Sequence, residues 1–334
     1  MAVERYRFAP GLVLEVRGNR GVVRHFHSEY GSVAVEPAGR VPVEVEFTAA
    51  AHSAGWIAVR GGHKTVRWEV AVAELDGESI RASIRLGGRP RTFALSLVQG
   101  YFVEPLLSVA AAHRGYVLLP SAALEEDGGA LLLMGRSRSG KSSLSVRGLV
   151  GGRRVLGDDQ VLLDVTGRCW PFPRRLRFYP DLARTAPGAY ARLPRASRAA
   201  LRLRRLGELL SGGYVRPPVR VRSDELGAGP GHDPLAVSRV VVIERAAGLE
   251  RFRSAEIDSR SAVAQANELL EEQRAKLRSG AEAWAEALDR TAEREALTLR
   301  QALADVPVER LSVPAHWDAV RALAALAERL RLPG

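Results

Sequence analysis

The sequence predicts an α/β protein in which a β-rich amino-terminal domain precedes a core of alternating strands and helices. Over residues 1–100, apolar positions often recur with period two, as at Val41, Val43, Val45 and Phe47, which is typical of strands with one buried face. From about residue 101, apolar runs of strand length alternate with helical patterns. Such alternation favours a mixed, largely parallel sheet with flanking helices. We therefore expect two domains, residues 1–100 and residues 101–334.

The first hundred residues predict an antiparallel sheet. Ile80, Ile84 and Leu86 alternate with polar residues after a turn at Asp76–Gly77, and further glycine pairs mark other turns. His25 and His27 would share one face of a strand and could bind a metal. No third ligand is evident, so we interpret them as exposed strand residues.

The second part of the chain predicts elements in the order of an α/β core. A helix should end near Arg114, and a strand, an acidic loop (125–129) and a second strand should follow it. Further elements continue the pattern: strands at 116–119, 130–134, 154–156, 161–163 and 239–243, a helix over 141–150, and a mostly helical segment from 261 that is interrupted at 307–314.

Composition restricts the class of protein. Hydrophobic residues make up 46% of the chain and aromatics 6%, as expected of a compact soluble protein. Cys169 is the only cysteine, which excludes disulfides within the chain and thiol-rich metal sites. The first residues lack the pattern of a signal peptide, and no uninterrupted apolar run approaches the roughly 18 residues of a membrane helix. We expect a cytoplasmic protein without a membrane partner.

The positive charge lies in one segment. The chain has a net charge of +11, and residues 174–222 hold thirteen arginines against two acids, Asp181 and Glu208. This segment therefore carries the whole excess charge. It is either a solvated helix or a groove for an acidic peptide or a phosphate group, for which arginine is well suited. Nucleic acid is not favoured, because no recognised binding motif accompanies the charge.

A complete phosphate-binding motif lies between the second strand and the helix that follows it. Gly135, Gly140, Lys141 and Ser142 have the spacing G-x4-G-K-S, and the residues between and beside them complete the predicted nucleotide contacts: Arg136, Ser137, Arg138, Ser139 and Ser143. Glycines let backbone N–H groups approach phosphate oxygens, and the helix dipole favours the anion. Lys141 would contact the terminal phosphates and Ser142 would ligate Mg²⁺. We therefore expect a P-loop core that binds ATP with magnesium.

Two adjacent carboxylates follow the phosphate-binding motif at a short spacing in the sequence. Asp158 and Asp159 begin 17 residues after Lys141, enough for a helix, a turn and a short returning strand. A crossover makes that strand parallel to the first, so its carboxyl end would lie beside the loop. One carboxylate could ligate Mg²⁺ and the other could accept a proton from an attacking hydroxyl. An ordinary surface turn is the alternative interpretation.

These motifs resemble those of the HPr kinase/phosphorylase superfamily, especially its HPr-kinase-related serine kinases. The resemblance covers residues 106–165 and rests on 131–144 followed by 155–159. It implies transfer of the γ-phosphate to a serine hydroxyl, with Asp158 as base and Asp159 as metal ligand, or the reverse. It also implies that His113, upstream of the loop, lies near the transferred phosphate.

The resemblance is closer to the related kinases than to HPr kinase/phosphorylase itself. The family usually has glycine where Arg138 stands, 28 residues separate His113 from Lys141, and the typical carboxyl-terminal segment is not found. The β-rich amino-terminal part is similar to that of the related kinases, some of which are found beside biosynthetic clusters. These include lasso-peptide clusters, where the acceptor is a peptide serine. The resemblance thus implies a peptide or protein acceptor.

Other nucleotide-dependent functions remain open from the sequence. Residues 210–214 resemble the signature of ABC-type ATPases, and 240–244 could be a strand that ends in a catalytic glutamate. The prolines Pro217 and Pro218 would stop the helix that such a signature requires. A small-molecule kinase and a regulatory nucleotide-binding module are further alternatives. The sequence leaves the acceptor and the oligomeric state open, including a homo-oligomer.

Overall fold

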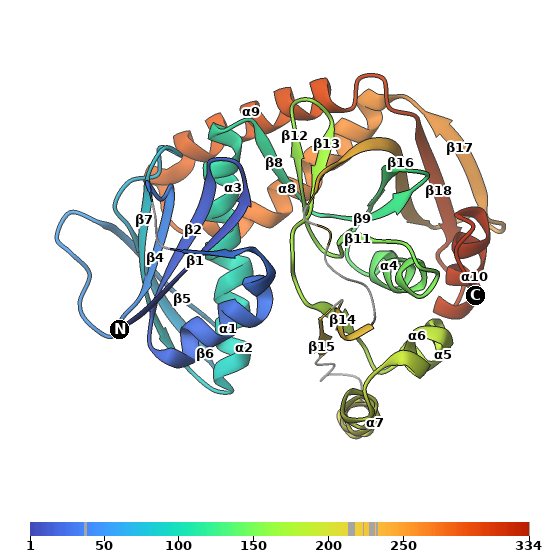
Figure 1. Cartoon of the computed structure of the whole chain (residues 1–334), viewed down its shortest axis with the longest axis horizontal. Helices are drawn as coiled ribbons and strands as arrows, with labels where there is room; N and C mark the ends of the chain where they lie inside the picture. The colour runs from blue at the N-terminus through green and yellow to red at the C-terminus, as the bar shows by residue number, and fades with distance from the viewer. Residues whose placement is uncertain (37–38, 213–217, 223, 227–230, 232, 334) are drawn as a thin grey trace. The chain divides into compact units, whose positions relative to one another are not determined.

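The structure is a computed structural model that describes residues 1–36, 39–212, 218–222, 224–226, 231 and 233–333. The chain divides into two compact units (Figure 1). Unit 1 comprises 1–119, 162–167 and 266–302, and unit 2 comprises 120–161, 168–265 and 303–334. Two mixed sheets with flanking helices confirm the predicted mixed α/β class. The predicted domain division at residue 100 stays a prediction.

Unit 1 contains a seven-stranded sheet of order β3-β1-β2-β4-β7-β6-β5. Its strands are β1 (Ala2–Ala9), β2 (Leu12–Gly18), β3 (Ala34–Val35), β4 (Val43–Phe47), β5 (Ile57–His63), β6 (Val66–Val72) and β7 (Ile80–Gly87). The expectation of a purely antiparallel sheet is wrong, because β4 runs parallel to both β2 and β7. A helix in the connection from β2 to β4, and the β5–β6 hairpin between β4 and β7, provide the long crossovers that parallel strands need.

The first of these connections also corrects the interpretation of the two histidines. His25 and His27 lie in helix α1 (Arg20–Tyr30), which Asn19 caps through its side chain, and not on a strand. Asn19 has the residue type that caps helices, a signal that the glycines on either side of it obscured. His25 is buried and contacts Gln99 (Nε2 to Oε1, 2.9 Å), and the His27 ring contacts the carboxylate of Glu4.

The helices of unit 1 include one continuous helical run, Arg91–His113. It consists of α2 (Arg91–Val98), a π-helical stretch η2 (Gln99–Val103) and α3 (Glu104–His113), and α2 and α3 pack on strands of the sheet. The remaining elements of this unit are η1 (Gly31–Val33), β8 (Tyr116–Leu119), β12 (Val161–Asp164, of which Val161 belongs to unit 2), η4 (Glu282–Trp284), α9 (Ala285–Ala302) and α8 (Ser259–Arg278), which begins in unit 2.

This run has the length and composition of a membrane span, contrary to the expectation that no segment approaches one. The expectation considered uninterrupted apolar runs, whereas polar residues such as Gln99 and Glu104 lie within this helix. Within the protein, 72% of the apolar window is buried, and the core helix of a soluble protein passes the same test. The finding is therefore weak evidence for a membrane.

Unit 2 is built on strands of order β11-β9-β10-β16-β18-β17, with β13 beside the start of β16. Their bounds are β9 (Ser121–Glu126), β10 (Gly129–Met134), β11 (Val155–Gly157), β13 (Arg168–Trp170), β16 (Leu235–Ala246), β17 (Arg253–Ile257) and β18 (Val308–Pro314). β10, β16 and β18 are parallel neighbours. β11 has the same direction as β10 but is separated from it by the antiparallel β9, so the returning strand is not the direct neighbour of the first.

The strand β9 also corrects the predicted acidic loop. Glu125 and Glu126 end β9, and the turn to β10 is short, with Asp127 and Gly128 both at positive φ. Charged residues at the end of a strand gave the segment the composition of a loop. The predicted helix over residues 141–150 is confirmed as α4 (Lys141–Val150).

Helix α4 is held between two apolar clusters. On one side Leu144 joins β10, β16 and β18 with helix α10 (Ala319–Arg329). On the other side Val146 and Leu149 contact a hairpin and three helices from the arginine-rich segment. That segment forms β14 (Leu176–Phe178), α5 (Leu182–Thr185), α6 (Pro187–Arg192), α7 (Arg195–Leu210) and β15 (Val219–Val221), followed by the short η3 (Asp224–Leu226). Packing on α4 thus fixes where the arginines of the hairpin lie.

Candidate functional site

The phosphate-loop motif connects β10 to α4 with a backbone that glycine makes possible. Gly135 has φ +153° and Gly140 has φ +108°, and a Cβ at these positions would lie 2.5 Å from the carbonyl oxygen of Ile243 and 2.8 Å from Leu323. Arg138 adopts φ +68°, also in the left-handed region. This conformation is one that glycine adopts at least cost, so the loop places a residue with a side chain where the backbone favours glycine.

The amino terminus of α4 offers backbone donors. Gly140 is the N-cap, and no side chain of the described residues caps this end. The first N–H groups of a helix have no partner within the helix, so those at Lys141, Ser142 and Ser143 are available to an anion. In the loop, the Ser139 hydroxyl is buried and has no hydrogen-bond partner among the described residues. Both features fit a phosphate group.

Lys141 folds back over the loop. Its Nζ donates to the carbonyl oxygens of Gly135 and Arg136, the latter at 3.2 Å. Burial lowers the pKa of Lys141, while the charges of Asp159 and Asp158 oppose this shift. The ammonium group therefore lies at the loop and within electrostatic reach of both aspartates.

The two aspartates follow β11 and lie in different environments. Asp158 is 3% exposed, and neither carboxylate oxygen has a hydrogen-bond partner of good geometry in the described part of the chain. Burial and the neighbouring charge of Asp159 raise the pKa of Asp158 to about 7, although the Ser142 hydroxyl, Arg177 and Lys141 favour the charged form. Burying a charged carboxylate is costly, so an additional positive ligand would stabilise the charged form of Asp158.

Asp159 is surrounded by arginines that the sequence did not single out. Its Oδ2 lies 2.9 Å from Arg177 and 3.8 Å from Arg174. Burial disfavours its charge, but Arg177, Arg174, Lys141 and Arg220 outweigh burial and hold the pKa of Asp159 below its usual range. Arg177 and Arg220 lie in β14 and β15, so the hairpin that packs on α4 carries them to the aspartates.

The donor set fits magnesium bound with a nucleotide. No group of three or more His, Cys, Asp or Glu side chains among the described residues could hold a metal alone. Mg²⁺ usually binds one or two carboxylates together with waters and substrate phosphates. Ser142, Asp158 and Asp159 supply a hydroxyl and two carboxylates beside the loop. These residues would hold the ion, which would neutralise phosphate charge there.

Other predicted residues lie outside this group. His113 belongs to unit 1, where it ends α3 and accepts a hydrogen bond from Arg294 (Nη1 to Nδ1, 2.7 Å), so its role near the phosphate stays a prediction. The segment proposed as an ABC signature includes residues 213 and 214, which lie outside the described residues. Glu244 lies in β16, next to the strand before the loop, where it accepts from Ser312 (2.6 Å).

Comparisons with known proteins give no family for this chain. No protein-family model matches it, and a search among curated proteins returns no significant match. The argument for function therefore rests on the motif and on the geometry around it.

Proposed function

We propose that the chain is a magnesium-dependent kinase that transfers the γ-phosphate of ATP to a serine-type hydroxyl of a peptide or protein. The observation that carries the proposal is the grouping of the loop residues Lys141 and Ser142 with the adjacent carboxylates Asp158 and Asp159. A loop alone supports only nucleotide binding. A buried carboxylate beside it supports a reaction in which a proton must be removed.

In the proposed reaction the acceptor hydroxyl oxygen bonds to the γ-phosphorus while the bond from phosphorus to the bridging oxygen of ADP breaks. The hydroxyl proton passes to Asp158, whose raised pKa makes it the stronger base of the pair. Asp159, held ionised by arginines, is the proposed metal ligand. Lys141 supports the negative charge on the phosphates.

The opposite assignment has one supporting observation. The Ser142 hydroxyl lies close enough to Asp158 to favour its charged form, and Ser142 is itself a proposed metal ligand. If Asp158 binds the metal, Asp159 would face the acceptor. Replacing each aspartate by asparagine distinguishes the two, since loss of the base lowers transfer at saturating Mg²⁺ whereas loss of a ligand raises the Mg²⁺ requirement.

The acceptor in this proposal is acidic near its hydroxyl. Arg174, Arg177 and Arg220 converge on Asp159, so guanidinium groups lie beside the reacting group. Arginine binds carboxylates and phosphates through two parallel hydrogen bonds. These guanidinium groups would bind an anionic segment of the acceptor. As a separate point, we propose that the protein is cytoplasmic.

ATP hydrolysis without an acceptor is the second candidate function. Glu244 supports it, because β16 is the parallel neighbour of β10. Glu244 is, however, hydrogen-bonded to Ser312 and lies 3.9 Å from Arg310, and β16 continues past it to Ala246. A glutamate engaged in this way would have to release its partners to activate water.

The test is mass spectrometry of peptides encoded by neighbouring genes, after incubation with the full chain, Mg²⁺ and ATP. Phosphorylation of a serine by the wild-type protein but not by Lys141→Ala supports the kinase. ATP turnover that is equal with and without every acceptor, and that Glu244→Gln abolishes, would support hydrolysis instead.

A further inference from the structure

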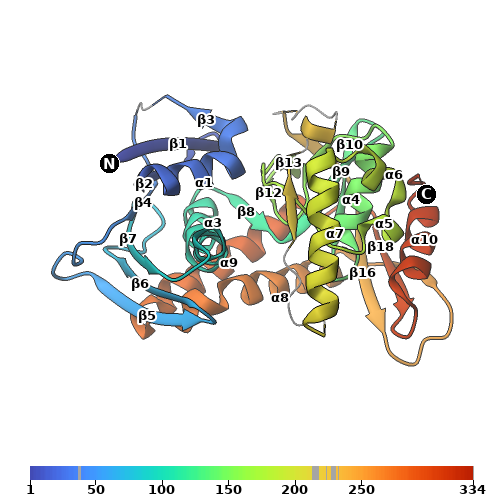
Figure 2. The ribbon, with the colours of Figure 1, turned by 90° about the horizontal axis from the view of Figure 1, so that it is seen from below.

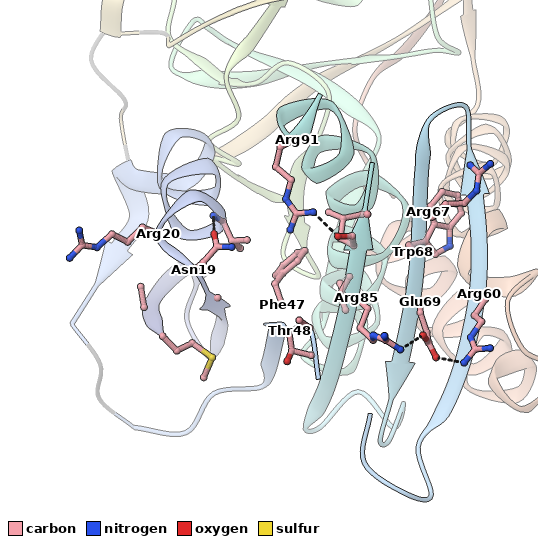
Figure 3. Close-up of a pocket in the computed structure, with 18 of the residues that line it drawn as sticks. Asn19, Arg20, Phe47, Thr48, Arg60, Arg67, Trp68, Glu69, Arg85 and Arg91 are labelled. Carbon is pink, nitrogen blue, oxygen red and sulfur yellow. Dashed lines mark hydrogen bonds and ion pairs between the residues drawn. The ribbon is translucent and has the colours of Figure 1, made fainter. Parts of the chain in front are cut away.

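A groove in unit 1 lies where a strand of the sheet stops early (Figure 3). It encloses about 1180 Å³ and is lined by residues of β4 to β7, by the start of β1 and the end of β2, and by the first residues of α1 and α2. β4 lies between β2 and β7, and its pairing with β7 ends at Phe47 opposite Ile84. β7 continues to Gly87. One strand position beside the end of β7 is therefore without a strand of the described chain.

The backbone of β7 faces this position. Ile84 accepts from Thr48 N (3.0 Å), so its backbone groups face β4, and Leu86, two residues later, faces the same side. The chain turns after Thr48, whose hydroxyl accepts from Ala50 N. The carbonyl of Leu86 instead accepts from the Arg91 side chain (Nη1, 2.6 Å). A side chain thus occupies the place where the next strand residue would bond.

The groove is strongly positive. Glu69 supplies the single carboxylate among the described lining residues. Five arginines line the groove: Arg20, Arg60, Arg67, Arg85 and Arg91. Glu69 is shared by Arg60 and Arg85 at 2.9 Å each, as the dashed lines in Figure 3 show. Arg67 and Arg91 donate to backbone carbonyls, and neither has a carboxylate partner among the described residues. Arg20 is exposed at the first turn of α1.

The residues that line the groove favour a polypeptide ligand over a nucleic acid. Single-stranded nucleic acid is usually bound by exposed aromatic rings on which bases stack. The aromatic residues described in this groove, Phe47 and Trp68, are 7% and 9% exposed and pack into the core. An open strand position with backbone groups directed into it is instead the feature that an extended peptide recognises.

We propose that this groove binds an extended, acidic polypeptide segment, which adds a strand beside Leu86 and places its carboxylates among the arginines. The segment displaces the Arg91 guanidinium from the Leu86 carbonyl, and Arg91 then pairs with a carboxylate of the ligand. The site belongs to unit 1 alone and does not depend on phosphoryl transfer at the loop.

The probe for the test is a fluorescein-labelled decapeptide of alternating glutamate and valine, titrated with the full chain and followed by anisotropy. We expect saturable binding that weakens in high salt, and slower hydrogen exchange at the Leu86 amide when the peptide is bound. Arg20→Glu should weaken binding by about fivefold. Arg81→Glu is the matched control, because Arg81 is exposed on β7 but outside the groove, and it should change binding less than twofold.

Two further probes examine the two parts of the proposal. The same peptide with N-methyl groups on alternate residues along one edge loses its strand hydrogen bonds and should not bind. A thymidine oligonucleotide of equal charge should bind much more weakly than the peptide. Absence of peptide binding, equal binding of the N-methylated peptide or the oligonucleotide, or equal effects of Arg20→Glu and Arg81→Glu would overturn the proposal.

Discussion

Lys141 is the residue on which the proposed nucleotide site most depends. Its ammonium group donates to carbonyls of the loop, and it would exchange these bonds for phosphate oxygens. We expect Lys141→Ala to weaken MgATP binding by at least about tenfold, since hydrogen bonds to charged groups contribute about 1.5–3 kcal/mol. Calorimetric titration measures the affinity, and Lys276→Ala, at the end of α8, is the control. Equal affinity of wild type and Lys141→Ala would remove the basis for the site.

Asp158 is expected to be essential for transfer but not for nucleotide binding. Asp158→Asn keeps the shape of the side chain and removes the base, so phosphorylation of a verified acceptor should fall by about 10²–10⁴-fold. Asp159→Asn should raise the Mg²⁺ concentration required for half-maximal transfer. The measurement is initial rate against Mg²⁺ for each variant. The reverse pattern would exchange the roles of Asp158 and Asp159. Wild-type rates for both variants would contradict both assignments.

The environment of Asp158 predicts how metal-free protein responds to pH. Asp159, Arg177, Lys141 and Ser142 surround it, and its pKa is raised in the folded state. A raised carboxyl pKa contributes stability below its unfolded value near 4, and this contribution is lost as pH rises through about 7. In EDTA at pH 8, the wild type should therefore be less stable than the Asp158→Asn variant. Addition of Mg²⁺ should stabilise the wild type more than it stabilises this variant. Equal pH dependence in thermal melts of both proteins would contradict this.

The sequence predicted the part of the site that is continuous in the chain. Loop residues 135–143 and the aspartate pair stand at fixed spacings, and each has a chemical role that its residue type reveals. Arg174, Arg177 and Arg220 could not be selected from thirteen arginines, because the packing of a hairpin on α4 decides which of them reach Asp159. The backbone of Arg138 could not be predicted either, since arginine is not a residue that signals positive φ.

At the scale of elements, helix α7 carries five arginines against one acid, Glu208, and Figure 2 shows it as one uninterrupted helix (yellow). Leu201 faces the core, whereas Leu203, Leu206 and Leu210 lie on the opposite, exposed face. Arg204 donates to the carbonyl of Pro218 and therefore has a structural role, whereas Arg205 is exposed. The exposed arginines are the ones to change in a test of acceptor binding.

We expect the double variant Arg202→Glu, Arg205→Glu to raise the KM for an acidic acceptor severalfold and to leave MgATP affinity unchanged. Among the described residues, the Arg202 side chain hydrogen-bonds only to the Tyr190 hydroxyl (3.1 Å), so folding should persist. The rise in KM should shrink in high salt, because exposed charges are screened. A KM that responds to neither the substitutions nor salt would leave α7 as a solvated helix.

Local patterns predicted elements where the chain itself forms them. The strand, loop and helix of residues 129–150 were clear because an apolar run, glycines and a helical pattern follow in order. Helix α1 was missed because its sequence lies among strand-like segments, and the parallel pairing of β4 was missed because pairing partners are distant in sequence. Patterning reveals which face of an element is buried but not which element covers it.

At the scale of the whole molecule, the chain returns to unit 1 long after it has left it. Residues 266–302 supply most of α8 and all of α9 to the unit that begins at the amino terminus. Three helices meet there: the Ser108 hydroxyl of α3 donates to Glu295 of α9 (2.7 Å), and Arg274 of α8 pairs with the same carboxylate. Arg274 is 2% and Glu295 0% exposed. Their burial could not be predicted, because charged residues on a helix normally face solvent.

This pair should make unit 1 sensitive to single substitutions. Burial raises the pKa of Glu295, while Arg274 and Ser108 oppose the shift, so the ionised carboxylate depends on its partners. Glu295→Ala leaves the buried Arg274 guanidinium with only the partly exposed Glu271 as an ion-pair partner. We expect it to destabilise the unit by about 3 kcal/mol, the lower end of the range for a broken buried pair. The double variant Arg274→Met, Glu295→Leu removes both charges and should recover most of that loss, because an apolar replacement of similar volume avoids the desolvation cost. Hydrogen exchange at the α3 amides, measured against urea, reports unit 1 specifically, and equal stability of Glu295→Ala and wild type would show that the pair does not hold these helices together.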